Sequence, residues 1–363
     1  MTKKKAIIHI GGHKTGSSAI QAFCVANASR LKALGIAYPL ELVSDVDKMG
    51  AQAHHGLVNL LMDAKSFWKS FNLRPKSMTD ADIKNHLKAL PRTENYLFSS
   101  ENLVWLDKDA IETLKQLLDG FDVHILLYVR RQDDALQAIY QTVVTSIGET
   151  KHFDEYTDQV VRSIFEYDRI AALWQSAFGA GKVVVRVYEP SQLHRGDAVQ
   201  DFFNALEAIL QRQIDISDWV RNSGTGAVNR GLPAHITGLI RYHNGLPTKK
   251  WVVPFIQKFA ARLYKNSLGG YEIIPPSQRK EVLESFAESN KCLAIGFLGR
   301  KDGKLFHDLS IKQTDSEWDA KYKRQGSQLR LLVCDIIAFI KSPNNIKNKI
   351  LEKNDPAKER PTS

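Results

Sequence analysis

A glycine-rich turn near the start of the chain has the residue types that bind anions. An apolar run at 6–10 gives way to Gly11 and Gly12. Lys14 and Gly16 follow before an amphipathic pattern begins. This order predicts a strand, a tight loop and a helix N-terminus. The first N–H groups of a helix have no partner within it, and its dipole adds positive charge there, so we expect a phosphate-like anion to bind without a metal.

The position of the lysine distinguishes this loop from that of an NTPase. Gly11 to Gly16 fit the G-x-x-x-x-G frame, in which lysine and then serine or threonine follow the last glycine. Here Lys14 precedes Gly16, and two serines, Ser17 and Ser18, follow it. The loop therefore suits a different anhydride, and a nucleotide kinase or NTPase on the same architecture is kept as an alternative.

Polar side chains also follow the other predicted strands. The apolar run at 123–129 is the strongest strand signal in the chain and continues into Arg130. A β-prone run from residue 95 ends in polar residues that include Glu101, and the run at 183–188 ends in Tyr188. The carboxyl ends of parallel strands meet at one edge of a sheet, where ligands bind. We expect a site at this edge.

Helical patterns alternate with these strands. We expect helices at 17–34 (capped by Ser17 or Ser18), 108–118, 132–140, 160–178, 199–210, 276–298 and 322–340, and helices and loops without sharp boundaries at 36–95. Alternating strands and helices predict an α/β fold, with a P-loop-like parallel sheet between two helical layers and further helical additions.

Composition limits the classes of partner and compartment. The net charge of +10 favours anionic partners, and Cys24, Cys292 and Cys334 form no C-x-x-C motif for a disulfide framework or thiolate metal site. No apolar run is long enough for a signal-peptide core or membrane span, so we expect a cytoplasmic protein. The basic stretch 251–264 fits a packed helix better than a membrane-surface helix, so peripheral membrane contact stays an alternative.

The segment 13–18, His-Lys-Thr-Gly-Ser-Ser, resembles the 5′-phosphosulfate loop of sulfotransferases that use 3′-phosphoadenosine 5′-phosphosulfate (PAPS). The histidine before the lysine, with Ile20 and Gln21 after the loop, is similar to the bacterial sulfotransferase-like branch. The resemblance implies a three-layer α/β/α fold and Lys14 as the cation at the leaving phosphate. It implies PAPS binding by Gly12, His13, Lys14, Thr15, Gly16, Ser17, Ser18, Arg130 and Tyr188, with no metal required.

A second matching element is the corner after the strand at 123–129. In the family an arginine at this corner and a serine eight residues later bind the 3′-phosphate; Arg130 matches the arginine, but Ala138 stands at the serine position. Arg131, Gln137 and Gln141 are candidates to compensate for the missing hydroxyl.

Two further segments extend the resemblance over about residues 5–306. Tyr188-Glu189-Pro190 resembles the family's Tyr-Glu corner near the adenine, and Asn290–Leu298 with Leu305-Phe306 resembles the end of its domain. The resemblance implies one sulfotransferase-like domain at 1–341, followed by a flexible tail at 342–363. It assigns nucleotide binding to 6–35, 95–145 and 183–190, and acceptor-side helical additions to 36–95 and 205–285.

The resemblance predicts sulfuryl transfer from PAPS to a hydroxyl or amine acceptor. The basic charge favours a glycan or glycolipid precursor as acceptor, and we expect no nucleic-acid partner. A general base must remove the acceptor proton. Glu101 is the first candidate, followed by His55 and His54. A protein that binds 3′,5′-bisphosphoadenosine without catalysis is the other alternative, favoured by Ala138.

Overall fold

The computed structural model describes residues 3–44, 52–62, 75, 78–157, 159–221, 232–247, 253–254, 256–257 and 272–324. Its centre is a sheet of five strands in the order β2 (Ile36–Ala37), β3 (Asn95–Ser99), β1 (Lys5–His9), β4 (Asp122–Val129) and β5 (Val183–Val187). Every neighbouring pair of strands is parallel, which confirms the predicted fold class. The short edge strand β2 was not predicted, because two residues are too few to show a strand pattern.

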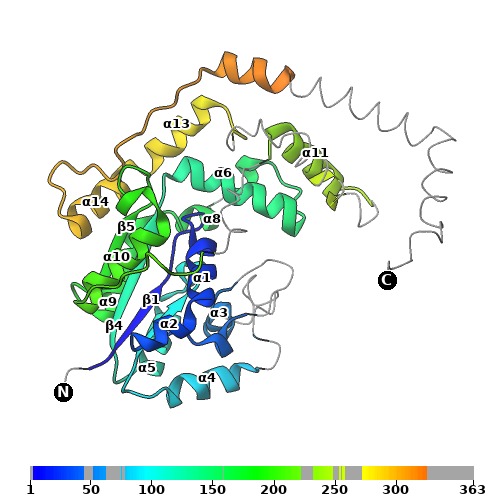
Figure 1. Cartoon of the computed structure of the whole chain (residues 1–363). Helices are drawn as coiled ribbons and strands as arrows, with labels where there is room; N and C mark the ends of the chain where they lie inside the picture. The colour runs from blue at the N-terminus through cyan, green and yellow to red at the C-terminus, as the bar shows by residue number, and fades with distance from the viewer. Residues whose placement is uncertain are drawn as a thin grey trace, which may run out of the picture.

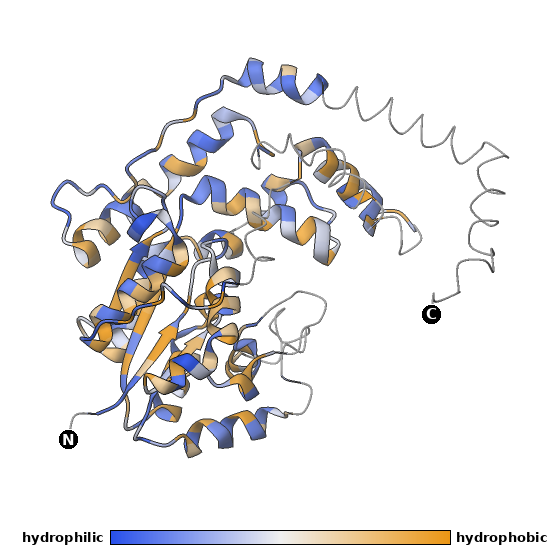
Figure 2. Ribbon diagram, viewed as in Figure 1, coloured by the Kyte–Doolittle hydropathy of each residue, from blue (hydrophilic) through white to orange (hydrophobic). Residues whose placement is uncertain are grey.

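Helices cover both faces of the sheet. Ile7 of β1 packs with α1 (Ser17–Ala26) and α10 (Ala198–Leu210) on one face. Its neighbour Ile8 packs on the other face with α5 (Lys108–Leu117) and α9 (Tyr167–Phe178). Successive strand residues point to opposite faces, so both must be apolar when both are covered. Figure 2 shows strands that are hydrophobic along most of their length, and helices that are hydrophilic on their outward sides.

The strand order places β1 at the point where the direction of the connections reverses. β1 pairs with β3 on one side and β4 on the other, and His9 lies opposite Ser99 and Leu126. The carboxyl ends of β1, β3, β4 and β5 therefore meet at one edge, where ligands bind in open parallel sheets. Beyond this edge lie α6 (Gln132–Thr142), α11 (Ala234–Asn244) and α13 (Pro276–Ser285) (Figure 1).

Three helices that were predicted as continuous are each divided in two, so those boundaries were wrong. The predicted helix at 17–34 forms α1 and α2 (Ala28–Ala33). The one at 160–178 forms α8 (Gln159–Ser163) and α9, and the one at 276–298 forms α13 and α14 (Ala287–Leu298). At the first break, the buried Asn27 side chain bonds the backbone of Val220 in both directions. Buried aromatic residues, Phe165 and Phe286, stand at the other two breaks. Long-range tertiary contacts therefore override the local helical pattern at these points.

The remaining elements connect this framework. They are η1 (Leu40–Leu42), α3 (His55–Leu61), α4 (Asp80–Ala89), η3 (Glu101–Trp105), the π-helical turn η4 (Val143–Ile147), α7 (Phe153–Tyr156) and η5 (His194–Gly196). Residues 315–324 are also helical. The rest of the helix predicted at 322–340, the tail at 342–363 and most of 251–264 lie outside the described residues. Within those residues, no helix is long and apolar enough to span a membrane.

Candidate active site

The loop between β1 and α1 has an unusual backbone. Gly11, Lys14 and Gly16 have φ angles of +51°, +65° and +83°. For a residue with a side chain, as at Lys14, this conformation costs about 1–2 kcal/mol, and such strain is concentrated at functional sites. Gly16 is the N-cap of α1 and no side chain caps the helix, so the predicted cap by Ser17 or Ser18 is wrong. Without a side-chain cap, the positive end of α1 is available to an anion.

The loop packs tightly against the neighbouring strand and against itself. A Cβ on Gly12 would lie 2.4 Å from the carbonyl oxygen of Tyr128 in β4, so only glycine fits there. The hydroxyl of Thr15 donates a hydrogen bond to the carbonyl oxygen of Gly12 over 2.7 Å. The loop is therefore held in one shape before any ligand binds.

Arg130 and Tyr188 lie against the loop from the ends of β4 and β5. The Arg130 guanidinium donates a hydrogen bond of 2.9 Å to the carbonyl oxygen of Lys14, and lies 5.7 Å from the ring centroid of Tyr188. The Tyr188 ring in turn borders Gly16, where a Cβ would lie 3.1 Å from a ring carbon. Burial lowers the pKa of Lys14, Glu101 opposes this, and Arg130 lowers it further. Arg130 and Tyr188, which are distant from the loop in the sequence, thus both contact it in the structure.

Glu101 lies at the start of η3, close enough to Lys14 to affect its pKa. Its side chain is partly exposed, and its Oε2 accepts a hydrogen bond of 2.9 Å from Gln21 Nε2 of α1. Burial alone would raise the pKa of Glu101. His55, the Gln21 hydrogen bond, the residue's own backbone N–H and His13 outweigh burial and set the pKa at about 2. Glu101 is therefore a carboxylate at neutral pH.

The two candidate histidines of α3 differ in their contacts. His54 accepts a hydrogen bond at Nδ1 from the Ser99 N–H, and Nε2 lies 3.1 Å from the carbonyl oxygen of Pro39. Both ring nitrogens of His54 thus have partners. Burial lowers the pKa of His54 to about 3, although the two hydrogen bonds act to raise it. The neighbouring His55 contacts the Ser100 hydroxyl through Nδ1 at 2.7 Å. Burial lowers the pKa of His55, and Glu101 raises it. These contacts favour His55 over His54 as a proton acceptor.

His13 connects the loop to η3. Its Nε2 accepts a hydrogen bond of 3.0 Å from the indole N–H of Trp105. Because an indole N–H only donates, Nε2 is unprotonated and the imidazole is neutral. Burial lowers the pKa of His13 to about 4, with Glu101 opposing it. This contact ties the loop to the turn that carries Glu101.

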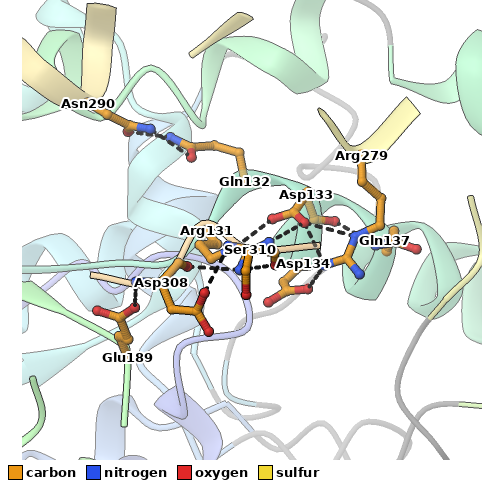
Figure 3. Close-up of polar contacts among 10 residues, drawn as sticks. All are labelled: Arg131, Gln132, Asp133, Asp134, Gln137, Glu189, Arg279, Asn290, Asp308 and Ser310. Atoms are coloured by element: carbon orange, nitrogen blue, oxygen red, sulfur yellow. Dashed lines mark hydrogen bonds and ion pairs between the residues drawn. The ribbon is translucent and has the colours of Figure 1, made fainter. Parts of the chain in front are cut away.

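The three residues expected to compensate for Ala138 have structural partners, and Figure 3 shows those of Arg131. Arg131 forms an ion pair with buried Asp133 and donates to a backbone carbonyl at residue 308. Gln137 accepts from the backbone N–H groups at 273 and 274. Gln141 binds the backbone at residue 232 and a nearby threonine hydroxyl. None of these three side chains is left uncommitted to replace the missing hydroxyl.

The later matching segments serve as structural ties. The Glu189 carboxylate, next to Tyr188, accepts the backbone N–H groups of His307 and Asp308 at 3.0 and 2.9 Å. Asn290 exchanges two amide hydrogen bonds with Gln132, of 2.6 and 3.1 Å (Figure 3). These contacts fasten the segment after α14 and α14 itself to the corners that follow β5 and β4.

Sequence reasoning missed Gln21, Ser99 and His9 as members of the site. All three are buried, and they link Glu101 to β1 by hydrogen bonds. The available signals were a histidine and a serine at the ends of apolar runs and a glutamine in the helix after the loop. In the part of the chain that the structure describes, no group of three or more histidine, cysteine or acidic residues could hold a metal.

Comparison with known proteins gives the following similarities. No family model matches the chain. An uncharacterized protein from Archaeoglobus fulgidus is 28% identical over 238 residues, which are 64% of this chain and 59% of the relative. The chain thus spans less than two thirds of that relative.

Two solved structures are similar to this one. One is a sulfotransferase from Alicyclobacillus acidocaldarius, with 13% identity, a TM-score of 0.40, and coverage of 77% of this chain and 94% of the other. The other is the sulfotransferase domain from the curacin biosynthetic pathway, with 11% identity and a TM-score of 0.39. The similarity covers 79% of this chain and 98% of that domain. The protein is structurally similar to sulfotransferases over most of its chain.

Proposed function

We propose that this protein is a PAPS-dependent sulfotransferase that transfers a sulfuryl group to a hydroxyl or amine acceptor. The main observation behind the proposal is the loop at the reversal point of a parallel sheet. Its strained Lys14 is close enough to the Glu101 carboxylate and the Arg130 guanidinium for each to affect the lysine pKa. A cation beside an uncapped helix N-terminus suits a leaving phosphate, and a nearby carboxylate suits an acceptor proton.

The residues of the loop fit the 5′-phosphosulfate of PAPS. Gly12 and Gly16 allow neighbouring protein atoms to pack where a Cβ would meet them, which fixes the loop in the shape proposed to bind the ligand. We assign Lys14 to the oxygen between phosphorus and sulfur, and Arg130 to the 3′-phosphate. PAPS supplies the sulfuryl group when bound; the protein contributes positioning and electrostatic stabilisation.

Transfer breaks the bond between sulfur and the phosphate oxygen and forms a bond from sulfur to the acceptor oxygen or nitrogen. The electron pair of the broken bond stays on the phosphate, where Lys14 offsets the developing charge. Glu101 takes the acceptor proton. A pKa of about 2 makes Glu101 a weak base. A bound anion beside it raises the pKa, because like charges disfavour the ionised form. His55 is the second choice.

An anionic carbohydrate or glycolipid precursor is our first choice of acceptor. The net charge of +10 favours association with such molecules. The second candidate function is a protein that binds bisphosphoadenosine without transferring a sulfuryl group. The observation that favours it is Ala138, whose buried methyl group stands where a serine hydroxyl is expected.

The direct test incubates the protein with PAPS and a panel of carbohydrate and glycolipid acceptors, and measures release of 3′,5′-bisphosphoadenosine. Lys14→Ala should lower kcat by about 100-fold or more, since it removes a charge that acts mainly in the transition state. Lys32→Ala is the matched control, because Lys32 is an exposed lysine on α2 and should leave kcat unchanged. Wild-type activity in Lys14→Ala would refute the mechanism. Binding without transfer would favour the second candidate, and magnesium-dependent ATP turnover would indicate an NTPase.

A further inference from the structure

A chain of polar side chains runs from Glu101 into the centre of the sheet. Gln21 Nε2 lies 2.9 Å from Glu101 Oε2 and 3.2 Å from Ser99 Oγ. Ser99 Oγ lies 2.8 Å from Nδ1 of His9. The last three residues are at most 1% exposed and belong to α1, β3 and β1. Three separate elements therefore contribute to one buried hydrogen-bond chain that ends at a partly exposed carboxylate.

The carboxylate fixes the direction of the two hydrogen bonds that Gln21 makes in this chain. An ionised Glu101 only accepts, so the NH₂ group of Gln21 faces it, and the same nitrogen also donates to Ser99 Oγ. Ser99 Oγ lies 2.8 Å from Nδ1 of His9, and the tautomer of the ring decides which of the two donates. Burial lowers the pKa of His9 to about 4, with Glu101 opposing it, which agrees with a neutral ring.

His9 forms the inner end of this chain, beneath the anion-binding loop. Its Nε2 has no hydrogen-bond partner among the described residues, and lies 3.6 Å from where a Cβ of Gly11 would be. The edges of Tyr128 and Phe202 enclose the ring, with centroids 5.6 and 5.1 Å away. The ring is thus held by packing, with its Nδ1 against the Ser99 hydroxyl.

We propose that Gln21 is a positioning residue for Glu101, and that Ser99 and His9 hold the Gln21 amide in its donating orientation. Gln21 binds one carboxylate oxygen, which restricts rotation of the carboxylate and favours its ionised form. The role of Glu101 as the base rests on the proposed function. The hydrogen-bond chain does not depend on it.

Several other groups act on Glu101 and must stay unchanged in a test of this idea. The groups whose charges interact with Glu101 are His9 of β1, His13 and Lys14 of the loop, Tyr38 near β2, and His55 of α3. A substitution at Gln21 leaves the contacts of these groups in place, whereas a substitution at Ser99 also removes the contact of its hydroxyl with His9. Changes in the titration of Glu101 in such variants therefore report on the hydrogen-bond chain.

The first experiment measures kcat as a function of pH at saturating PAPS and acceptor. Gln21→Met keeps the volume but removes the donor, so the acid limb should move up by about one pH unit. Ser99→Ala and His9→Phe should move it progressively less. Gln141→Met is the matched control, since it removes another buried glutamine and should leave the limb in place. An unmoved limb in Gln21→Met, or a larger shift in His9→Phe than in Gln21→Met, would overturn the proposal.

The second experiment needs no enzymatic activity. Carbon-13 NMR of glutamate δ-carbons follows Glu101, with its signal assigned by comparison with Glu101→Gln. In Gln21→Glu a second carboxylate faces Glu101, and the pair should hold one proton at least two pH units above the wild-type midpoint. A Glu101 titration equal to that of wild type would refute the contact. If no acceptor is sulfated but this shift is found, the proposed function fails and the positioning contact stands.

Discussion

Replacing Gly12 with alanine should disable the loop through a single steric contact. The new Cβ would lie 2.4 Å from the carbonyl oxygen of Tyr128, whereas carbon and oxygen normally approach to about 3.3 Å. The carbonyl belongs to the buried strand β4 and cannot yield, so the loop must move by about 1 Å. A misplacement of this size lowers the rate of a reaction that needs aligned groups by about 100-fold. Overpacking should also reduce the free energy of unfolding by about 1–3 kcal/mol.

The assay is calorimetric binding of 3′,5′-bisphosphoadenosine, combined with urea unfolding of the same samples. Gly35→Ala is the matched control, because Gly35 also has a positive φ of +65° but no atom within 4 Å of an added Cβ. It should lose about 1–2 kcal/mol of stability from backbone strain and no affinity. If Gly12→Ala folds and binds with wild-type affinity, the loop is not the anion site and the reasoning is refuted.

Three further substitutions test other parts of the structure. Asp133→Asn should lower the free energy of unfolding in urea by about 3 kcal/mol, because it removes a buried carboxylate from two partly buried arginines, whereas the more exposed Asp134→Asn should lose less than about 1 kcal/mol. Burial acts to raise the pKa of Asp122, but hydrogen bonds and charges, first among them Lys182, lower it to about 2. A carboxyl group whose pKa is lower in the folded than in the unfolded state stabilises the fold above the unfolded pKa, near 4, and this stabilisation is lost as the pH falls toward 2. The difference in free energy of unfolding between wild type and Asp122→Asn should therefore shrink only between about pH 4 and pH 2. Arg130→Ala should weaken binding of 3′,5′-bisphosphoadenosine at least 10-fold while leaving that of adenosine 5′-phosphate nearly unchanged; equal losses in calorimetry would exclude a 3′-phosphate contact.

The strands and the loop could be predicted because their signals are local. The run that forms β4 is almost entirely apolar, as a strand covered on both faces must be, and glycines mark the turn after β1. The expectation that Lys14, Glu101, Arg130 and Tyr188 meet at one edge followed from the parallel order alone. Their pairwise contacts with the loop required the three-dimensional structure.

Helix boundaries were less predictable because distant residues decide them. The pattern after the loop continues through Asn27, yet the helix is divided there by hydrogen bonds to Val220, 193 residues away in the sequence. The same limitation applies to the compensating residues. Gln137 and Gln141 are polar residues on a helix near the site, and only the fold gives them backbone partners elsewhere.

The sequence by itself determined the α/β class, the order of strand, glycine-rich loop and helix, and the early position of Lys14. These features depend on residue type and on the spacing between neighbours, which local backbone preferences convert into structure. The tertiary structure decided that His54 has both ring nitrogens engaged, and that Gln21, Ser99 and His9 form one chain with Glu101. Such contacts join elements far apart in the sequence, so no local pattern of residue types reveals them.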